Sequence, residues 1–221
     1  MDAIFPEVLV FCDILARTTL VTALTMAGDR QNAMATAKHL VEVADSSPNP
    51  WARSFALLTY GYACCDADPA GARDALRRGL VIARDSGNRY SESHLANVLG
   101  RLEARHGEEH AALDYLSLAI RNYQNSGNIS TMRVPLAALA AFLVRLGHHE
   151  PAAAIAGFAV SPMTTIWIPE LGSAIVRLRE VLSDEKYDAL ARKGETMTAS
   201  AIAAYAYDQI DQARTELEQP C

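Results

Sequence analysis

Apolar residues recur with helical spacing in two neighbouring segments near the middle of the chain, SHLANVLGRLEARHG and EEHAALDYLSLAIRNYQNSG. In the first segment they stand at positions i, i+3, i+4 and i+7, and in the second at i, i+4 and i+7, which places each set along one face of a helix. The small residues of the second segment allow two helix axes to approach closely. These positions are Leu95, Val98, Leu99 and Leu102 in the first segment, and Ala112, Leu116 and Ala119 in the second.

The same organisation recurs along the chain with a nearly constant period. A small residue marks a break, an alanine follows five positions later, and both series advance by 39, 40 and 40 residues. A helix stop follows each second segment, and the glycines at two of these stops suit the left-handed conformation that ends a helix. The breaks are Gly28, Ala67, Gly107 and Gly147, the alanines are Ala33, Ala72, Ala112 and Ala152, and the stops lie near Pro48, Gly87 and Gly127.

This period predicts an all-α fold, an α-solenoid of about four antiparallel helix pairs. No window shows a convincing alternation with a period of two, which a strand would require. We expect residues 1–160 to hold the repeats and residues 161–221 to add C-terminal capping helices to the same domain. The segment SPMTTIWIPE within this second part is expected to be a proline-bearing loop.

The segment HGEEH has the spacing of an inverted zinc-peptidase motif, with His106 and His110 one helical turn apart and Glu109 beside the second histidine. Zinc binding would need both imidazoles on one face of an unbroken helix. Gly107 occupies a repeat break, so the sequence predicts that His106 ends one helix and His110 begins the next. Glu108 and Glu109 then complement the positive end of the second helix.

The third repeat, NVLGRLEARHGEEHAALDYLSLA, resembles a tetratricopeptide repeat, with Leu99 and Gly100 at its Leu-Gly pair and Gly107 at its turn. The other repeats lack that pair, and the period exceeds the usual 34 residues. Long, alanine-rich repeats of this kind resemble the C-terminal helical region of actinobacterial signalling ATPases of the LuxR and adenylate-cyclase-associated type. The resemblance implies a TPR-like α-solenoid.

The C-terminal part is similar to the ending of those proteins. PAAAIAGFA resembles their alanine-rich closing helix with its internal glycine, here Gly157. IVRLREVLSDEKYDALARKGETMTASAIAAYA resembles their last helices, with Tyr187, Gly194, Met197 and Thr198 at the positions of the aromatic, glycine, methionine and cap. The chain has no G-x-x-x-x-G-K-[ST] segment, so ATP hydrolysis is not implied.

A non-enzymatic regulatory module that binds a partner protein is therefore the expected function, as part of a bacterial signalling or transcriptional regulator. A solenoid binds a peptide or helix on the concave face formed by the first helix of each pair. In the third repeat the resemblance places His94, Asn97 and Arg101 on that face. Asn and Arg side chains suit an extended backbone or a carboxylate.

Two other functions stay open at this point. A hydrolase or a zinc-dependent enzyme would use the HGEEH segment, although no nucleophile elbow or phosphate loop accompanies it. A small-molecule sensor would use the SPMTTIWIP segment as a cover over the end of the array. No catalytic residue, metal or cofactor is expected.

Composition and charge limit the kinds of partner and environment that we expect for this chain. The chain has 221 residues, is 50% hydrophobic and carries a net charge of −6, which disfavours direct binding to nucleic acid. Four cysteines without metal-ligand spacing favour a reducing, cytoplasmic environment. Glu7, Asp13 and Arg17 interrupt the apolar N-terminal stretch, so no membrane segment is expected. A homodimer and a larger multidomain chain both stay open.

Overall fold

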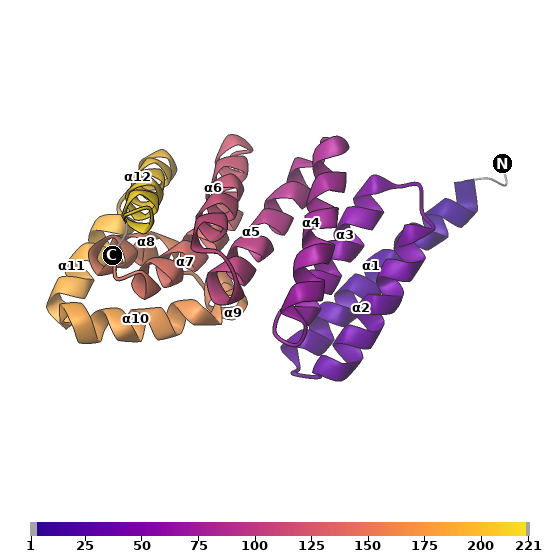
Figure 1. Ribbon diagram of the computed structural model, residues 1–221, viewed down its shortest axis with the longest axis horizontal. Coiled ribbons are helices and arrows are strands. Elements are labelled where there is room, and N and C mark those ends of the chain that lie inside the picture. The colour runs from indigo at the N-terminus through magenta and orange to yellow at the C-terminus, as the bar shows by residue number, and fades with distance from the viewer. Residues whose placement is uncertain (1–3, 220–221) are drawn as a thin grey trace. The chain divides into compact units, whose positions relative to one another are not determined.

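The computed structural model describes residues 4–219, and side-chain burial from residue 8 onward. Within that range the chain forms twelve helices and no strand, so the all-α prediction is confirmed (Figure 1). The helices are α1 (Ile4–Met26), α2 (Arg30–Asp45), α3 (Pro50–Cys64), α4 (Pro69–Asp85), α5 (Arg89–His106), α6 (Glu109–Asn125), α7 (Ile129–Arg145), α8 (His149–Ala159), α9 (Pro162–Trp167), α10 (Pro169–Leu182), α11 (Asp184–Glu195) and α12 (Ala199–Leu217).

The chain divides into two compact units, residues 1–102 and residues 103–221, which we call unit 1 and unit 2. The division falls within α5, between Leu102 and Glu103. The expected separation of repeats from capping helices at residue 160 stays a prediction.

The four predicted breaks each separate two helices. At each break, residues close in sequence end the first helix and begin the second. Asp29 and Asp68 cap the helices that follow the first two breaks, since each side chain accepts a hydrogen bond from a backbone N–H of the next turn. Glycines with positive φ end four helices, at Gly28, Gly87, Gly127 and Gly147. The turn chemistry anticipated from the repeat pattern is thus present.

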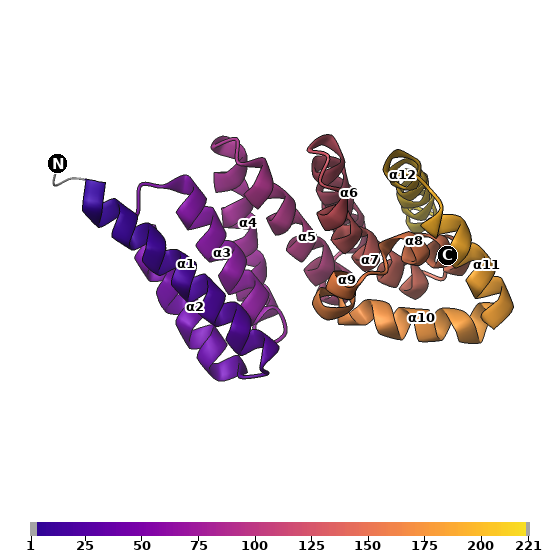
Figure 2. The same cartoon turned by 180° about the vertical axis from the view of Figure 1, so that it is seen from behind.

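In unit 1, α1 and α2 form one helical hairpin and α3 and α4 form the next. A buried apolar cluster joins the two hairpins through α1, α2 and α3. In both ribbon views α1 and α2 lie at the edge of unit 1 opposite α5 (Figures 1 and 2). The buried members of the cluster are Ile14, Leu40, Ala44, Ala52 and Ala56.

Trp51, at the start of α3, packs between two aromatic rings rather than lining a site. Its ring stacks on Phe55 at 4.7 Å between centroids and lies 5.1 Å from Phe11 on α1. Trp51 thus packs at the contact between α1 and α3.

In unit 2, one large apolar cluster connects α6, α7 and α8 with the helices that follow them. Helix α10 packs on α7 and α8, α11 packs on α8, and α12 packs mainly on α6. The predicted C-terminal helices thus cover the α6 to α8 layer of this unit (Figure 1). Among the described residues, side chains with little or no exposure from all of these helices contribute, including Leu116, Leu136, Ile155, Leu178 and Ile202.

The segment SPMTTIWIPE is not the expected loop. Residues 162–167 form the short helix α9, and α10 begins at Pro169. The Ser161 hydroxyl accepts a hydrogen bond from the N–H of Thr164 at 3.2 Å, and the N–H of Ser161 donates to the Thr164 hydroxyl at 2.9 Å. This reciprocal capping box, with Pro162 at the first helical position, starts a helix where the prolines alone indicate a break.

Helices α8 and α11 approach each other through glycine. A methyl group on Gly157 of α8 would overlap the carbonyl of Ala191 on α11, and one on Gly194 of α11 would overlap the carbonyl of Ala154 on α8. Both glycines are therefore required by backbone contact between the two helices. We call this pair of reciprocal contacts the α8–α11 seam.

Candidate functional site

Helix α5 carries the residues that the sequence places at a binding surface, and it is unusual in what it buries. Among the described residues, more buried polar side chains lie on α5 than on any other helix. Buried polar groups cost free energy unless they are hydrogen-bonded, so a cluster of them on one helix needs an explanation. They are Ser91, Glu92, Ser93, Asn97 and Glu103.

Asn88 positions the start of this polar segment. Its side-chain oxygen accepts a hydrogen bond from the N–H of Ser91 at 3.1 Å, and its amide nitrogen donates to the Ser91 hydroxyl at 3.0 Å. Gly87, with φ of 69°, turns the chain directly before this cap. Local turn chemistry thus brings Ser91 and Glu92 into the first turn of α5.

Glu92 is only 2% exposed and forms two ion pairs. Nε of Arg84 on α4 lies 3.0 Å from one carboxylate oxygen, and Nη1 of Arg89 lies 2.8 Å from the other. Burial acts to raise the pKa of Glu92, but the hydrogen bonds from Arg89 and Arg84 outweigh it, and the pKa lies below its ordinary value. Glu92 therefore stays a carboxylate and ties α5 to α4.

Asn97 lies one turn further along α5 and is only 6% exposed. Its side-chain oxygen is buried and has no hydrogen-bond partner in the structure. An unpaired buried acceptor of this kind costs about 1–3 kcal/mol. Asn97 is thus a buried side chain on α5 whose acceptor is left without a donor.

His94 and Arg101 flank Asn97 at helical spacing, at i−3 and i+4, and both are half-buried. The imidazole of His94 lies 4.4 Å from the ring of Tyr90 between centroids. Burial lowers the pKa of His94 to about 4, so its ring is neutral at pH 7. All three predicted groove residues therefore share one face of α5, and whether that face binds a partner stays a prediction.

Sequence analysis did not single out Glu92 and Ser91 as part of this surface. The sequence did contain a signal for them. Residues 91 and 92 stand four and three positions before Leu95, so they extend its apolar stripe towards the start of the helix. Polar residues at positions that the helical period assigns to a buried face mark a site where burial and polarity conflict.

The HGEEH segment does not form the arrangement that a zinc site needs. Helix α5 ends at His106, α6 begins at Glu109, and both histidines are exposed. The predicted break is confirmed, and it separates the two imidazoles onto different helices. Across residues 4–219, no group of three or more His, Cys, Asp or Glu side chains is arranged to hold a metal ion.

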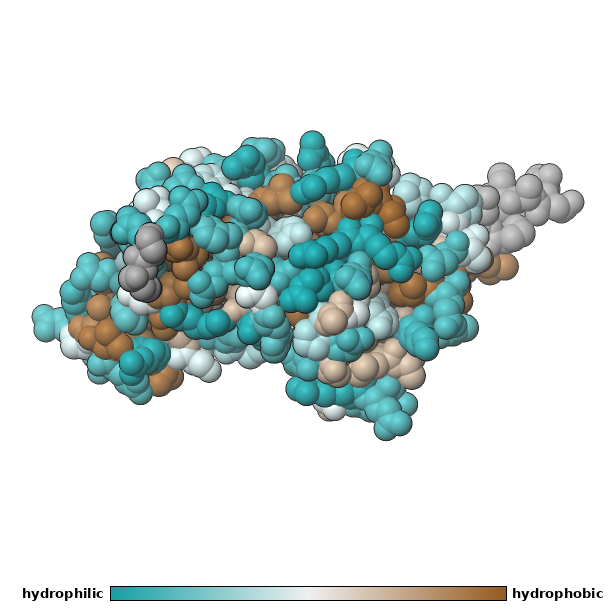
Figure 3. All heavy atoms as spheres, viewed as in Figure 1, coloured by the Kyte–Doolittle hydropathy of each residue, from teal (hydrophilic) through white to brown (hydrophobic). Residues whose placement is uncertain are grey.

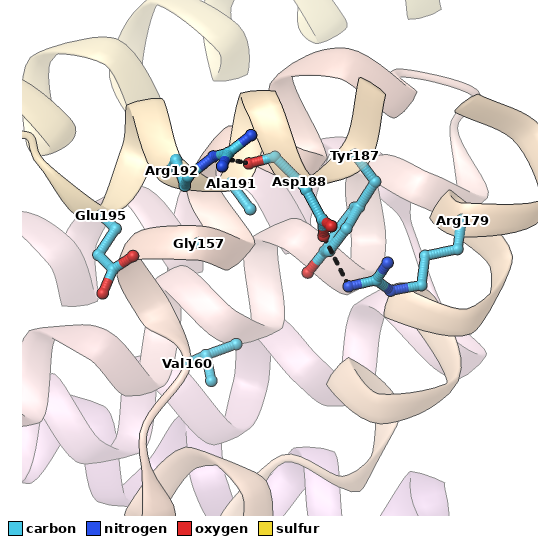
Figure 4. Close-up of a pocket in the computed structure, with 8 residues that line it drawn as sticks. All are labelled: Gly157, Val160, Arg179, Tyr187, Asp188, Ala191, Arg192 and Glu195. Carbon is cyan, nitrogen blue, oxygen red and sulfur yellow. Dashed lines mark hydrogen bonds and ion pairs between the residues drawn. The ribbon is translucent and has the colours of Figure 1, made fainter. Parts of the chain in front are cut away.

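A shallow pocket of about 400 Å³ lies in unit 2 where α8, α10 and α11 meet (Figure 4). Arg179 reaches from α10 to Asp188 on α11 at 2.8 Å, and its guanidinium lies over the ring of Tyr187 at 4.4 Å. Nε of Arg192 donates to the backbone carbonyl of Asp188 at 3.2 Å. These basic groups already have partners within the unit, so the pocket has the character of a helix junction.

A second pocket, of about 280 Å³, lies in unit 1 between α2, α3 and α4. It mixes apolar side chains such as Leu57 with the charged Lys38, Asp74 and Arg78. The Tyr60 side chain at its wall has a raised pKa because of burial and the nearby Cys64.

The face of the molecule seen in Figure 3 is mostly hydrophilic, and its apolar areas are separated from one another by polar residues. One stretch in the described residues, Val8–Met26 in α1, is long and apolar enough to cross a membrane, with a mean hydropathy of 1.7. Asp13 and Arg17, expected to interrupt it, lie inside it. Length and composition alone are weak evidence for a membrane span.

Comparison with known proteins assigns no family to this chain. No family model matches the chain, and no curated protein or solved structure matches it.

Proposed function

We propose that this chain is a non-enzymatic interaction module whose helix pairs stack as a TPR-like solenoid and bind a partner peptide or helix along α5. The packing order within unit 1 supports the proposal. Helix α3 packs on both helices of the preceding pair, α1 and α2, as successive pairs of such an array do. The regulatory role in a bacterial signalling protein rests on the resemblance of the repeats and of the C-terminal helices.

The unpartnered side-chain oxygen of Asn97 carries the proposal. A carboxamide offers both a donor and an acceptor, so it can bond the N–H and the carbonyl of an extended backbone at once. In the free protein the buried acceptor has no donor, and the fold bears that cost. A ligand N–H that removes the cost makes binding more favourable by the same amount.

The neighbours of Asn97 suit a peptide better than a charged small ligand. His94 is neutral because of its burial, and the carboxylate of Glu92 is occupied by Arg84 and Arg89. The surface around Asn97 thus offers an amide, a neutral imidazole and the Arg101 side chain. Backbone hydrogen bonds with one cationic contact are typical of peptide recognition.

The test replaces Asn97 by Leu, which has the same branched shape and no hydrogen-bonding group. Because the orphaned acceptor disappears, we expect Asn97→Leu to raise the free energy of unfolding by about 1 kcal/mol. The same change should weaken partner binding at least about tenfold, through the loss of one buried hydrogen bond. Thermal melts measure the first effect. Quantitative pull-down from the source cell, followed by titration of the captured partner, measures the second.

Asn125→Leu, at an exposed position that ends α6, is the matched control and should change neither quantity. Equal capture of the same partner by wild type and Asn97→Leu would remove the basis of the proposal. A fall in stability for Asn97→Leu would show instead that the side chain is bonded within the fold.

A further inference from the structure

The pocket of about 280 Å³ in unit 1 is lined by one face of each of three helices, α2, α3 and α4. Helix α3 packs on both α2 and α4, so the three faces enclose a common space. The lining residues of each helix follow the i, i+3, i+4, i+7 spacing of a single helix face. They are Lys38, Val41 and Glu42 on α2, Leu57 and Tyr60 on α3, and Gly71, Asp74, Ala75 and Arg78 on α4.

The most buried of these lining residues are apolar. Leu57 is 1% exposed and Ala75 is 6% exposed. Val41 packs against the buried cluster that joins α1, α2 and α3, and the half-buried Tyr60 adds an aromatic ring. The inner part of the pocket therefore suits an apolar group of a ligand.

The four charged side chains of the pocket comprise two cations and two anions, and they differ in their partners. Glu42 lies 3.4 Å from Nδ1 of His39, and Arg78 lies 3.9 Å from a carboxylate oxygen of Asp45, so both have partners outside the pocket. Lys38 and Asp74 are exposed, and neither forms an ion pair with any described residue. One cation on α2 and one anion on α4 are thus left unpaired on two different walls.

This combination of charges disfavours a ligand with a single charge. An anion attracted by Lys38 would be repelled by Asp74, and a cation would meet the opposite pair of forces. A free α-amino acid at pH 7 carries an ammonium and a carboxylate on neighbouring atoms, so it satisfies both groups at once. The pocket is slightly smaller than the range of about 300–1,000 Å³ that is typical of pockets for drug-sized ligands, which fits a ligand of this size.

We propose that this pocket binds a free α-amino acid with an apolar side chain. Its carboxylate pairs with Lys38, its ammonium pairs with Asp74, and its side chain lies against Leu57 and Ala75. Because both charged groups are open to solvent, each ion pair contributes little, and we expect a dissociation constant of about 1 mM. The site is separate from the surface of α5, so it does not depend on the function proposed above.

An NMR titration of the full-length chain with L-leucine tests the class of ligand. We expect saturable binding of leucine. N-acetyl-leucine lacks the ammonium and leucinamide lacks the carboxylate, so each should bind about fivefold more weakly. Glycine has both charges and no side chain, and it should also bind at least about fivefold more weakly, because it leaves the apolar part of the pocket uncovered. Absence of saturable leucine binding, or equal affinities for the four compounds, overturns the proposal.

Matched variants test the position of the ligand. Lys38→Gln should weaken leucine binding about fivefold and leave the affinity for leucinamide unchanged. Asp74→Asn should weaken leucine binding by a similar factor and leave the affinity for N-acetyl-leucine unchanged. Lys193→Gln and Asp85→Asn remove exposed charges outside the pocket and should bind leucine as wild type does. Leucine binding that is unchanged in both Lys38→Gln and Asp74→Asn would place the ligand elsewhere and contradict the assignment.

Discussion

Helix α5 and the α8–α11 seam differ in what they bury: α5 buries polar side chains, and the seam buries backbone against backbone. On α5 the buried polar set consists of two carboxylates, two serines and an amide whose oxygen has no partner. In the seam two glycines bring backbones into contact, and no side chain intervenes. The seam gains close packing of two backbones. Helix α5 retains buried polar groups, and at Asn97 the fold bears the cost of an unpaired acceptor.

The largest effect is expected in the seam. Gly194→Ala adds a methyl group where the carbonyl of Ala154 already lies, so α8 and α11 must separate. We expect a loss of about 3 kcal/mol or more in the free energy of unfolding, because backbone cannot move aside as a side chain can. Thermal melts provide the measurement.

Gly172→Ala is the control for this substitution. Gly172 lies in α10 with open space around it, so alanine should stabilise that helix by about 0.5–1 kcal/mol. Similar melting temperatures for Gly194→Ala and wild type would show that the two helices are not in backbone contact.

A smaller effect is expected at Ala112 on α6, where the packed core leaves room for a side chain no larger than a methyl group. Ala112 is 0% exposed within the unit 2 cluster, and Ala111 beside it is half-buried. Ala112→Leu should cost about 1–3 kcal/mol through overpacking, and Ala111→Leu should cost less. Equal losses in chemical denaturation would mean that the apolar phase assigned to α6 is wrong.

The smallest effect is expected at His94 on α5 and depends on pH. The pKa of His94 is about 4, below the ordinary value near 6.5. As the pH falls below about 6.5, the unfolded chain binds a proton that the folded chain does not, so stability decreases until about pH 4. We expect this loss to be about 1–2 kcal/mol and to disappear in His94→Gln.

Melting temperatures at several pH values between 4 and 7 measure the difference between His94→Gln and wild type. His39→Gln, at an exposed histidine on α2, should follow the wild-type curve. If His94→Gln also follows it, the imidazole of His94 is as well solvated in the folded chain as in the unfolded one.

The breaks between helices were predictable because they depend on neighbouring residues. Glycines at 28, 87, 127 and 147 take the left-handed conformation, and Asp29 and Asp68 cap the helices that follow two of the breaks. Each of these signals acts within one turn of helix. The same locality explains the error at residues 161–170, where the capping box of Ser161 and Thr164 was overlooked and only the prolines were weighed.

The candidate site was predictable only in outline. The repeat pattern placed His94, Asn97 and Arg101 on one face of a helix, and the structure has them there. Asn97 is buried, and its oxygen has no hydrogen-bond partner. Both facts depend on the side chains that surround it in the fold, and helical spacing does not predict them. The ion pairs of Glu92 likewise need Arg84 from another helix.

The sequence alone determined the helical class, the turns and the phase of the apolar stripes, because helix propensity, capping and periodicity are properties of short segments. Only the tertiary structure decided which faces have partners. Gly157 and Gly194 are required because two helices cross there. The outer side of α1 is exposed because no described segment covers it. Burial is a relation between segments that are distant along the chain, so it is settled only when those segments pack.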